Sequence, residues 1–157
     1  MMQPLLEHSY SEETFTAQLG DLSQVLLRIE AMAPQEFYVL RGEVGAGKTT
    51  LSQQLLASWG IEDDVMSPTF SLVNPYTLPN GCKLYHHDWY RINEAGELFD
   101  AGIEEILNEF PSVHLIEWPE IGDFLLRDLL VNFKAKILEI QIEHQDNQRQ
   151  YRLLQYH

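Results

Sequence analysis

The sequence predicts an α/β protein with one domain, residues 1–157, in which helices cover both faces of a mixed, mainly parallel sheet. Two short apolar runs, 37–40 and 112–118, have the pattern of parallel strands that are buried on both faces. A glycine-rich turn at 41–47 joins the first run to a helical pattern at 49–59. This alternation of buried strand, turn and helix is typical of a three-layer sandwich.

The N-terminal region has apolar residues at helical spacing. Ser11 and the acidic residues after it favour the start of a helix, and Pro34 would end it. We therefore expect one helix over this region. Its apolar face would be formed by Phe15, Leu19, Leu22, Leu26 and Ile29.

The other elements are indicated by turn residues between short patterned segments. Asn80-Gly81 is a strong hairpin signal, and Asp146-Asn147 marks a second, C-terminal antiparallel hairpin. The strands of this second hairpin alternate apolar and polar residues, as half-exposed strands do. In chain order, we expect strands at 69–76 and 82–87, a helix at 94–108 interrupted near Gly102, a helix at 124–130, and strands at 136–143 and 150–155.

Charge restricts the function. The chain has 10 Lys and Arg against 24 Asp and Glu, so its formal net charge is −14. Such an acidic protein repels phosphate backbones, which disfavours direct, sequence-independent binding of nucleic acid, so a partner or a small local patch would have to supply positive charge for RNA. A single cysteine, Cys82, excludes an internal disulfide. Without a long apolar run or a signal-like N-terminus, we expect a cytoplasmic protein that does not enter a membrane.

The glycine-rich turn carries the clearest chemistry. Residues 42–49 read Gly-Glu-Val-Gly-Ala-Gly-Lys-Thr and match the phosphate-loop pattern G-x-x-x-x-G-K-[ST]. Glycines let successive N–H groups point at phosphate oxygens, Lys48 adds a positive charge, and the Thr49 hydroxyl is a magnesium ligand. The following helix directs its positive end at the same anion. We therefore expect a P-loop NTPase-like fold that binds a nucleoside triphosphate with Mg²⁺.

A phosphate loop is usually accompanied by a carboxylate at the end of a neighbouring strand. Glu117 ends the apolar strand 113–117, and Asp88 ends the strand 84–88. We expect Glu117 to coordinate Mg²⁺, directly or through water. Asp88 would orient the attacking water or complete the metal shell. The two assignments can be exchanged on the sequence alone.

Four further residues have both a functional and a structural interpretation. Thr69 lies downstream of the loop helix, where NTPases place a switch hydroxyl toward the γ-phosphate, but it also fits a plain turn. His86 and His87 are candidate ligands or bases, although strand histidines are more often packed or solvated. Trp118 is a candidate for stacking on a base or a partner, although core packing is the better explanation of an isolated aromatic.

Five segments in this order resemble the TsaE family, formerly YjeE. Members of this family are bacterial ATPases needed for threonylcarbamoyladenosine modification of tRNA. The resemblance covers nearly the whole chain, with mild departures at Glu43, Val44 and Trp89. The segments are Gly-Glu-Val-Gly-Ala-Gly-Lys-Thr-Thr (42–50), Ser-Pro-Thr-Phe (67–70), His-x-Asp-x-Tyr-Arg (86–91), Gly-Ile-Glu-Glu (102–105) and Ile-Glu-Trp-Pro-Glu (116–120).

The resemblance implies roles for individual residues. Thr49 and Glu117 match magnesium-linked positions, Asp88 and Thr69 match residues of hydrolysis and switching, and Trp118 matches a tryptophan beside the nucleotide. The start of the family's N-terminal helix lies near the adenine, which implicates Thr14. The residues implied to surround the phosphates are Glu43, Val44, Gly45, Ala46, Gly47, Lys48, Thr49 and Thr50.

The resemblance also implies partners. Family members act with TsaB and TsaD, and TsaD is the metal-dependent transferase that moves threonylcarbamoyl from its adenylate to adenosine 37 of tRNA. ATP binding is implied to favour docking on the TsaB–TsaD pair, and hydrolysis to reset the assembly. This protein would then meet tRNA only through the complex, in agreement with its negative charge.

Two other functions are compatible with a phosphate loop. A small-molecule kinase would use the same loop, but such kinases usually carry a lid with several arginines, and the six arginines here are scattered. A nucleotide-gated binding module with negligible hydrolysis would differ in its response to Glu117→Ala or Asp88→Ala, which would leave phosphate release unchanged while partner affinity still depends on ATP versus ADP. The leading hypothesis is a weak ATPase that drives a cycle on a protein partner.

Overall fold

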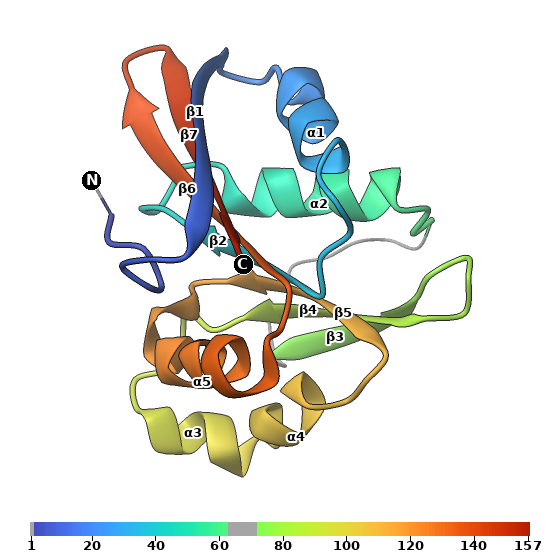
Figure 1. Ribbon diagram of the computed structural model, residues 1–157. Helices are drawn as coiled ribbons and strands as arrows, with labels where there is room; N and C mark the ends of the chain where they lie inside the picture. Colours follow the sequence, from blue (N-terminus) through green and yellow to red (C-terminus); the bar gives the residue numbers. More distant parts are fainter. Residues whose placement is uncertain (1, 63–71) are drawn as a thin grey trace.

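A computed structural model describes residues 2–62 and 72–157 (Figure 1). Its strands form one sheet in the order β1-β7-β6-β2-β5-β4-β3. The strands are β1 (Tyr10–Gln18), β2 (Phe37–Arg41), β3 (Val73–Thr77), β4 (Lys83–Asp88), β5 (Ser112–Glu117), β6 (Ile137–Gln145) and β7 (Gln148–Tyr156). The helices are α1 (Ser23–Glu30), α2 (Lys48–Ser58), α3 (Ala95–Asp100), α4 (Ile103–Leu107), α5 (Asp123–Phe133) and the short 3₁₀ helix η1 (Pro119–Gly122).

The centre of the sheet is parallel and its margins are antiparallel. β6, β2, β5 and β4 run in the same direction, whereas β1, β7 and β6 form an antiparallel ribbon and β3 pairs antiparallel with β4. The predicted fold class, a three-layer P-loop NTPase-like sandwich with a C-terminal antiparallel hairpin, is confirmed. Parallel pairing brings the carboxyl ends of the central strands to one edge of the sheet.

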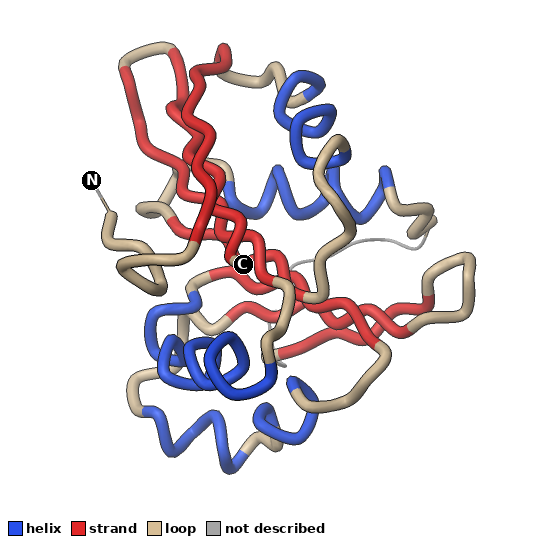
Figure 2. The backbone as a smooth tube through the Cα atoms, in the orientation of Figure 1, coloured by secondary structure: helices blue, strands red, loops and turns tan. Residues whose placement is uncertain are grey.

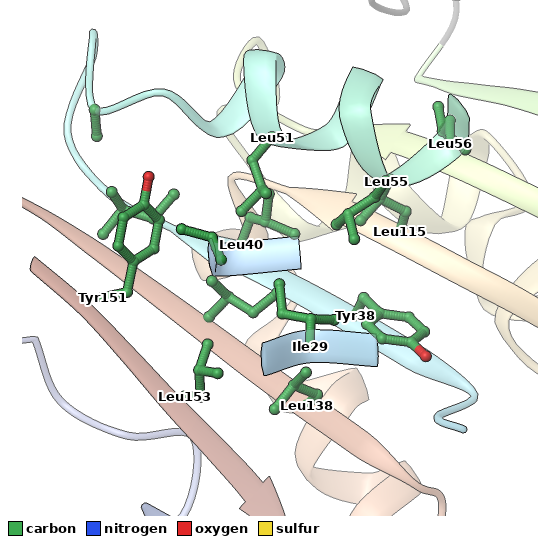
Figure 3. Packing of buried hydrophobic residues seen from close by; sticks show 14 of the residues in the cluster. Ile29, Tyr38, Leu40, Leu51, Leu55, Leu56, Leu115, Leu138, Tyr151 and Leu153 are labelled. Atoms are coloured by element: carbon green, nitrogen blue, oxygen red, sulfur yellow. The ribbon is translucent and has the colours of Figure 1, made fainter. Parts of the chain in front are cut away.

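Helices cover both faces of this sheet, as the backbone in Figure 2 shows. One core lies under α1 and α2, where Leu51, Leu55 and Leu56 of α2 pack on Tyr38 and Leu40 of β2 (Figure 3). A second core lies under α3, α4 and α5 on the opposite face. Side chains of β2 alternate between the two cores, so the whole strand is buried, as its apolar run predicts.

The expected N-terminal helix is wrong in its first half. Residues 10–18 form β1, which pairs with β7 along its full length, and the helix begins only at Ser23. Phe15 stacks on Tyr151 with ring centroids 5.5 Å apart. Gly20, with φ +85°, separates the strand from the helix. Leu26 and Ile29 lie in the helix and Leu22 is its N-cap, whereas the strand side chains upstream follow a period of two.

The expectation for the C-terminal hairpin is confirmed in position and partly wrong in burial. Asp146 and Asn147 lie in its turn, but residues 137–142 of β6 are all buried rather than half-exposed. The side chains of β6 alternate between the two cores, with Leu138 and Ile140 in one and Ile137 in the other, so both of its faces are covered. The other expected elements are found within a few residues of their predicted ends, and the part of the strand 69–76 before residue 72 lies outside the described residues.

A buried ion pair fixes the end of β2 to β6. Arg41 Nε donates to Glu139 Oε1 at 2.8 Å, and the Arg41 guanidinium forms a two-point contact with Asp123 at 2.9 and 2.6 Å. Glu139 is fully buried and also accepts hydrogen bonds from Gln141 Nε2, Tyr156 Oη and the Leu5 N–H. Since every lone pair of this carboxylate has a donor, its burial is compensated. The phosphate loop therefore starts from a rigid strand end.

A chain of buried polar groups crosses from β5 to β4 on the face covered by α3, α4 and α5. Ser112 Oγ lies 2.9 Å from His114 Nε2, and His114 Nδ1 lies 3.1 Å from His87 Nε2. His114 stacks between Phe37 and Tyr85. Burial lowers the pKa of His114 from 6.5 to about 4, and burial also lowers the pKa of His87.

The helices of the described residues are too short or too polar for any of them to span a membrane.

These histidines predict an acid-labile fold. Because the pKa of His114 is lower in the folded than in the unfolded chain, protonation favours unfolding, so stability decreases as the pH falls from 6.5 toward 4. We expect a contribution of about 3 kcal/mol over this interval, which His114→Phe should remove. Denaturant unfolding at several pH values measures this slope. His144→Asn, which changes an exposed histidine, is the control, and equal slopes for wild type and His114→Phe would contradict the prediction.

Candidate nucleotide-binding site

The phosphate loop follows β2 and leads directly into α2. Gly45 and Gly47 have φ values of +80° and +108°, which side-chain-bearing residues rarely adopt, and Gly47 is the N-cap of α2. Gly42 is required for a different reason. A Cβ on Gly42 would lie 2.8 Å from the Ile142 carbonyl oxygen and 2.9 Å from the Ala46 Cβ. Gly45 and Gly47 are therefore required by their backbone conformation, and Gly42 is required by its close packing against Ala46 and against Ile142 of β6.

Lys48 is folded back over the loop. Its Nζ donates to the carbonyl oxygens of Gly42 and Glu43 at 2.5 and 2.9 Å and lies 3.8 Å from the centre of the Trp118 ring. Burial lowers the pKa of Lys48, while the carboxylates of Glu117, Glu120 and Asp88 act in the opposite direction. A cation held in this way, at the N-terminus of a helix, is well placed to contact a polyphosphate.

Thr49, Glu117 and His86 form a hydrogen-bonded chain. Thr49 Oγ1 donates to Glu117 Oε1 at 2.9 Å, and Glu117 Oε2 lies 2.6 Å from His86 Nε2. Each residue comes from a different element, α2, β5 and β4. A hydroxyl and a carboxylate are hard oxygen ligands of the kind that Mg²⁺ takes, together with phosphate oxygens and water. Their direct contact fits a shared magnesium position.

Asp88 lies at the end of β4 and is aligned with Glu117 in the parallel ladder. Its Oδ1 accepts the Tyr90 N–H at 3.1 Å. Burial raises the pKa of Asp88, and the neighbouring Glu117 carboxylate acts in the same direction. A carboxylate with a raised pKa close to the loop has the properties of a general base. The same position of Asp88 also suits a ligand that completes the coordination shell of a metal ion.

Trp118 forms one wall of the site. Its φ of +57° is unusual for a residue with a side chain and costs on the order of 1–3 kcal/mol, a strain typical of functional sites. The Trp118 ring lies 4.8 Å from the Tyr90 ring. Between this wall and the loop is a pocket of about 340 Å³, lined by Val44, Gly45, Gly47, Lys48, Thr49, Thr50, Tyr90 and Trp118.

The structure brings most of the expected site residues together. Lys48, Thr49 and Trp118 line the pocket, and Glu117 and Asp88 lie at adjacent strand ends beside it. Glu43 contributes its carbonyl oxygen, and the exposed Val44 lines the rim. The Ala46 side chain packs closely against Gly42, because a Cβ added to that glycine would lie 2.9 Å from the Ala46 Cβ. Thr69 lies outside the described residues.

Thr14 does not lie at the start of a helix, which is where the resemblance placed it. It lies on β1 opposite Arg152 and lines a separate hollow of about 30 Å³ with Gln141, Glu143, Gln150 and Arg152. Thr14 lies in a strand because residues 10–18, which were expected to be helical, form β1. The helix is corrected to a strand, and the contact of Thr14 with the adenine stays a prediction.

Two participating residues were not singled out from the sequence. Tyr90 lines the pocket, and its place in the segment 86–91 was the available signal. Arg149 Nε donates to the Ala46 carbonyl oxygen at 3.3 Å and so ties the C-terminal hairpin to the loop. No local pattern indicated this contact, because the two residues are 103 positions apart.

A glycine-rich loop between a buried parallel strand and a helix, followed by lysine and threonine beside a strand-end carboxylate, defines a P-loop protein. Comparison with known proteins gives the family. Residues 12–152 match the family model described as threonylcarbamoyl adenosine biosynthesis protein TsaE. The chain belongs to the TsaE family, which confirms the resemblance drawn from the sequence.

Individual relatives agree with this assignment. The chain is 38% identical over 109 residues to the tRNA threonylcarbamoyladenosine biosynthesis protein TsaE of Rickettsia typhi, covering 69% of this chain and 74% of the relative. It is 39% identical over 112 residues to the protein of the same name from Haemophilus influenzae, covering 70% and 69%. The crystal structure of Bacillus subtilis YdiB superposes with a TM-score of 0.69 at 22% identity, covering 96% of this chain and 90% of YdiB, and shows the same fold.

The packing at Gly42 gives a direct test of the loop. We expect Gly42→Ala to lower the free energy of unfolding by about 1–3 kcal/mol and to weaken nucleotide binding, because the new Cβ must displace the Ile142 backbone or Ala46. Gly96→Ala is the matched control, since nothing lies within 4 Å of the Cβ it would add. Thermal unfolding and calorimetry with Mg-ATP measure both effects. Equal behaviour of the two variants would contradict the role of Gly42.

Proposed function

We propose that this protein is a Mg²⁺-dependent ATPase that acts with TsaB and TsaD in the threonylcarbamoylation of adenosine 37 of tRNA. In this function, ATP binding and hydrolysis cycle the complex between assembly states. The single observation that carries the proposal is the loop geometry: Lys48 at the N-terminus of α2, with the Thr49 hydroxyl paired to the buried Glu117 carboxylate. Membership of the TsaE family supplies the pathway.

The residues of the loop would bind and orient the triphosphate. Backbone N–H groups at 45–50 and the α2 N-terminus supply donors, and Lys48 would exchange its two carbonyl acceptors for phosphate oxygens. The Thr49 hydroxyl and the Glu117 carboxylate are the groups that would hold Mg²⁺. When bound, Mg²⁺ would neutralise charge on the phosphate oxygens and help align the triphosphate with the attacking water.

A base must also orient the attacking water. Asp88 is half-buried, its pKa is raised by burial, and it is the carboxylate neighbour of Glu117 along the sheet edge. We therefore assign the base to Asp88 and the metal to Glu117. With its Oδ1 already accepting one backbone N–H, Asp88 retains a second oxygen for the water.

Isolated turnover should be slow. Of the described residues that line the pocket, Lys48 is the only cation, so the charge that develops on the transferred phosphoryl group is incompletely balanced. A partner can supply the missing cation. The net charge of −14 also makes a protein surface, rather than tRNA itself, the direct contact of this chain.

Substitutions separate the assigned roles. We expect Lys48→Ala to weaken Mg-ATP binding by about 10- to 100-fold, the loss of one charge-assisted hydrogen bond. Asp88→Asn should leave affinity nearly unchanged and reduce kcat by about 10²- to 10⁴-fold, the range of general-base catalysis. Calorimetry and phosphate release measure the two quantities. Unchanged affinity of Lys48→Ala would refute triphosphate binding by the loop, and unchanged kcat of Asp88→Asn would remove Asp88 as the base.

The partners provide the second test. We expect ATP turnover to rise when purified TsaB and TsaD are added together, by up to about 10³-fold or more if a partner places an arginine at the site. A pull-down in ATP, ADP or no nucleotide should show strongest retention in ATP. Equal turnover with and without the partners would reject stimulation. If the partners are retained in ATP but not in ADP and no ATP is hydrolysed, a nucleotide-gated binding module would be favoured.

A further inference from the structure

We propose that His86 is a positioning residue that fixes the orientation of the Glu117 carboxylate through a hydrogen bond from its Nε2–H to Oε2. Glu117 Oε1 is thereby kept facing Thr49 and the phosphate loop. This inference rests on the proposed function, because it explains how the carboxylate assigned to the metal is held.

The sheet places the two groups side by side. β4 and β5 are parallel neighbours with Asp88 aligned to Glu117, and the period of two puts His86 on the same face as Asp88. His86 Nε2 lies 2.6 Å from Glu117 Oε2, and the two side chains are 0% and 1% exposed. A contact this short between fully buried polar groups is a strong, charge-assisted hydrogen bond.

The other ring nitrogen shows which atom carries the hydrogen. His86 Nδ1 is buried and has no hydrogen-bond partner in the described part of the chain. A hydrogen on Nδ1 would leave a buried donor unsatisfied, which is more costly than an unpaired acceptor lone pair. The hydrogen is therefore on Nε2, and the ring donates to the carboxylate.

This donation makes the two oxygens of Glu117 different. The last torsion of a glutamate side chain has a broad energy minimum, so an unsupported carboxylate can rotate. With Oε2 held by His86, Oε1 stays at 2.9 Å from Thr49 Oγ1. The ligand oxygen is thus presented next to the Thr49 hydroxyl, as supporting hydrogen bonds do in metal sites.

The neighbouring histidine is a natural control. His87 is on the same strand and is also fully buried, but its side chain lies on the opposite face and contacts His114. Both histidines contribute to packing, yet only His86 contacts Glu117. An effect seen on replacing His86 but not His87 therefore reports on the carboxylate rather than on burial.

The test compares His86→Leu, His86→Gln and His87→Leu with the wild type. We measure binding of a non-hydrolysable ATP analogue by calorimetry, with and without Mg²⁺, and take the ratio of the two affinities. His86→Leu should lower this ratio about 10- to 100-fold while binding without Mg²⁺ is kept. His86→Gln, which retains an N–H donor, should restore much of the ratio, and His87→Leu should keep it at the wild-type value.

Nitrogen NMR of the nucleotide-free wild type gives an independent measurement, which does not require any variant to fold. His86 should show a hydrogen on Nε2 and a bare Nδ1. A hydrogen on Nδ1, or an unchanged Mg²⁺ ratio in His86→Leu, would overturn the inference. A wild type whose binding does not respond to Mg²⁺ would instead overturn the proposed function, and the NMR result would then decide alone whether His86 donates to Glu117.

Discussion

The parallel pairing of β2, β5 and β4 is the constraint on which the site depends. It places the end of β2, where the phosphate loop begins, beside the ends of β5 and β4, which carry Glu117 and Asp88. No local interaction could bring these groups together, because Thr49 and Glu117 are 68 residues apart. The positions of the loop and of the carboxylates to which we assign the metal and the base are therefore products of strand direction, and a change in register would separate them all.

The buried charged side chains around the loop in the described part of the chain, those of Lys48, Glu117 and Arg41, are already paired inside the protein. Lys48 contacts backbone carbonyls and the Trp118 ring, and Glu117 contacts Thr49 and His86. Behind the loop, Arg41 is held by Glu139 and Asp123. Such pairing offsets the desolvation of buried charges. In the proposed function, ligand binding would exchange one set of contacts for another, so the net gain in free energy would be moderate.

Sequence reasoning predicted the elements that have strong local signals. The glycine-rich loop, the apolar strands predicted at 37–40 and 112–118, the Asn80-Gly81 turn and the break at Gly102 all follow from backbone chemistry over a few residues. Residues 10–18 were assigned to a helix because the apolar spacing of the real helix α1 extends by coincidence into the strand. Strand β1 is recognisable only through its partner β7, which lies at the other end of the chain. The same limit applies to the site. The strand pattern around His86 does not show that its ring contacts Glu117, which lies 31 residues away in the chain. The sequence around Glu139 likewise does not show that this carboxylate pairs with an arginine.

The composition of the two outer strands has a consequence for the behaviour of the chain in concentrated solution. An unprotected sheet margin offers a row of N–H and C=O groups on which another molecule can add a strand, the first step of fibre growth. At one margin of the described sheet, β1 exposes Glu12 and neighbouring polar side chains. At the other margin, β3 contains Pro75, which has no N–H to offer. Both margins of the described sheet are thus poor templates for intermolecular strand pairing, which lowers the tendency of the chain to grow fibres.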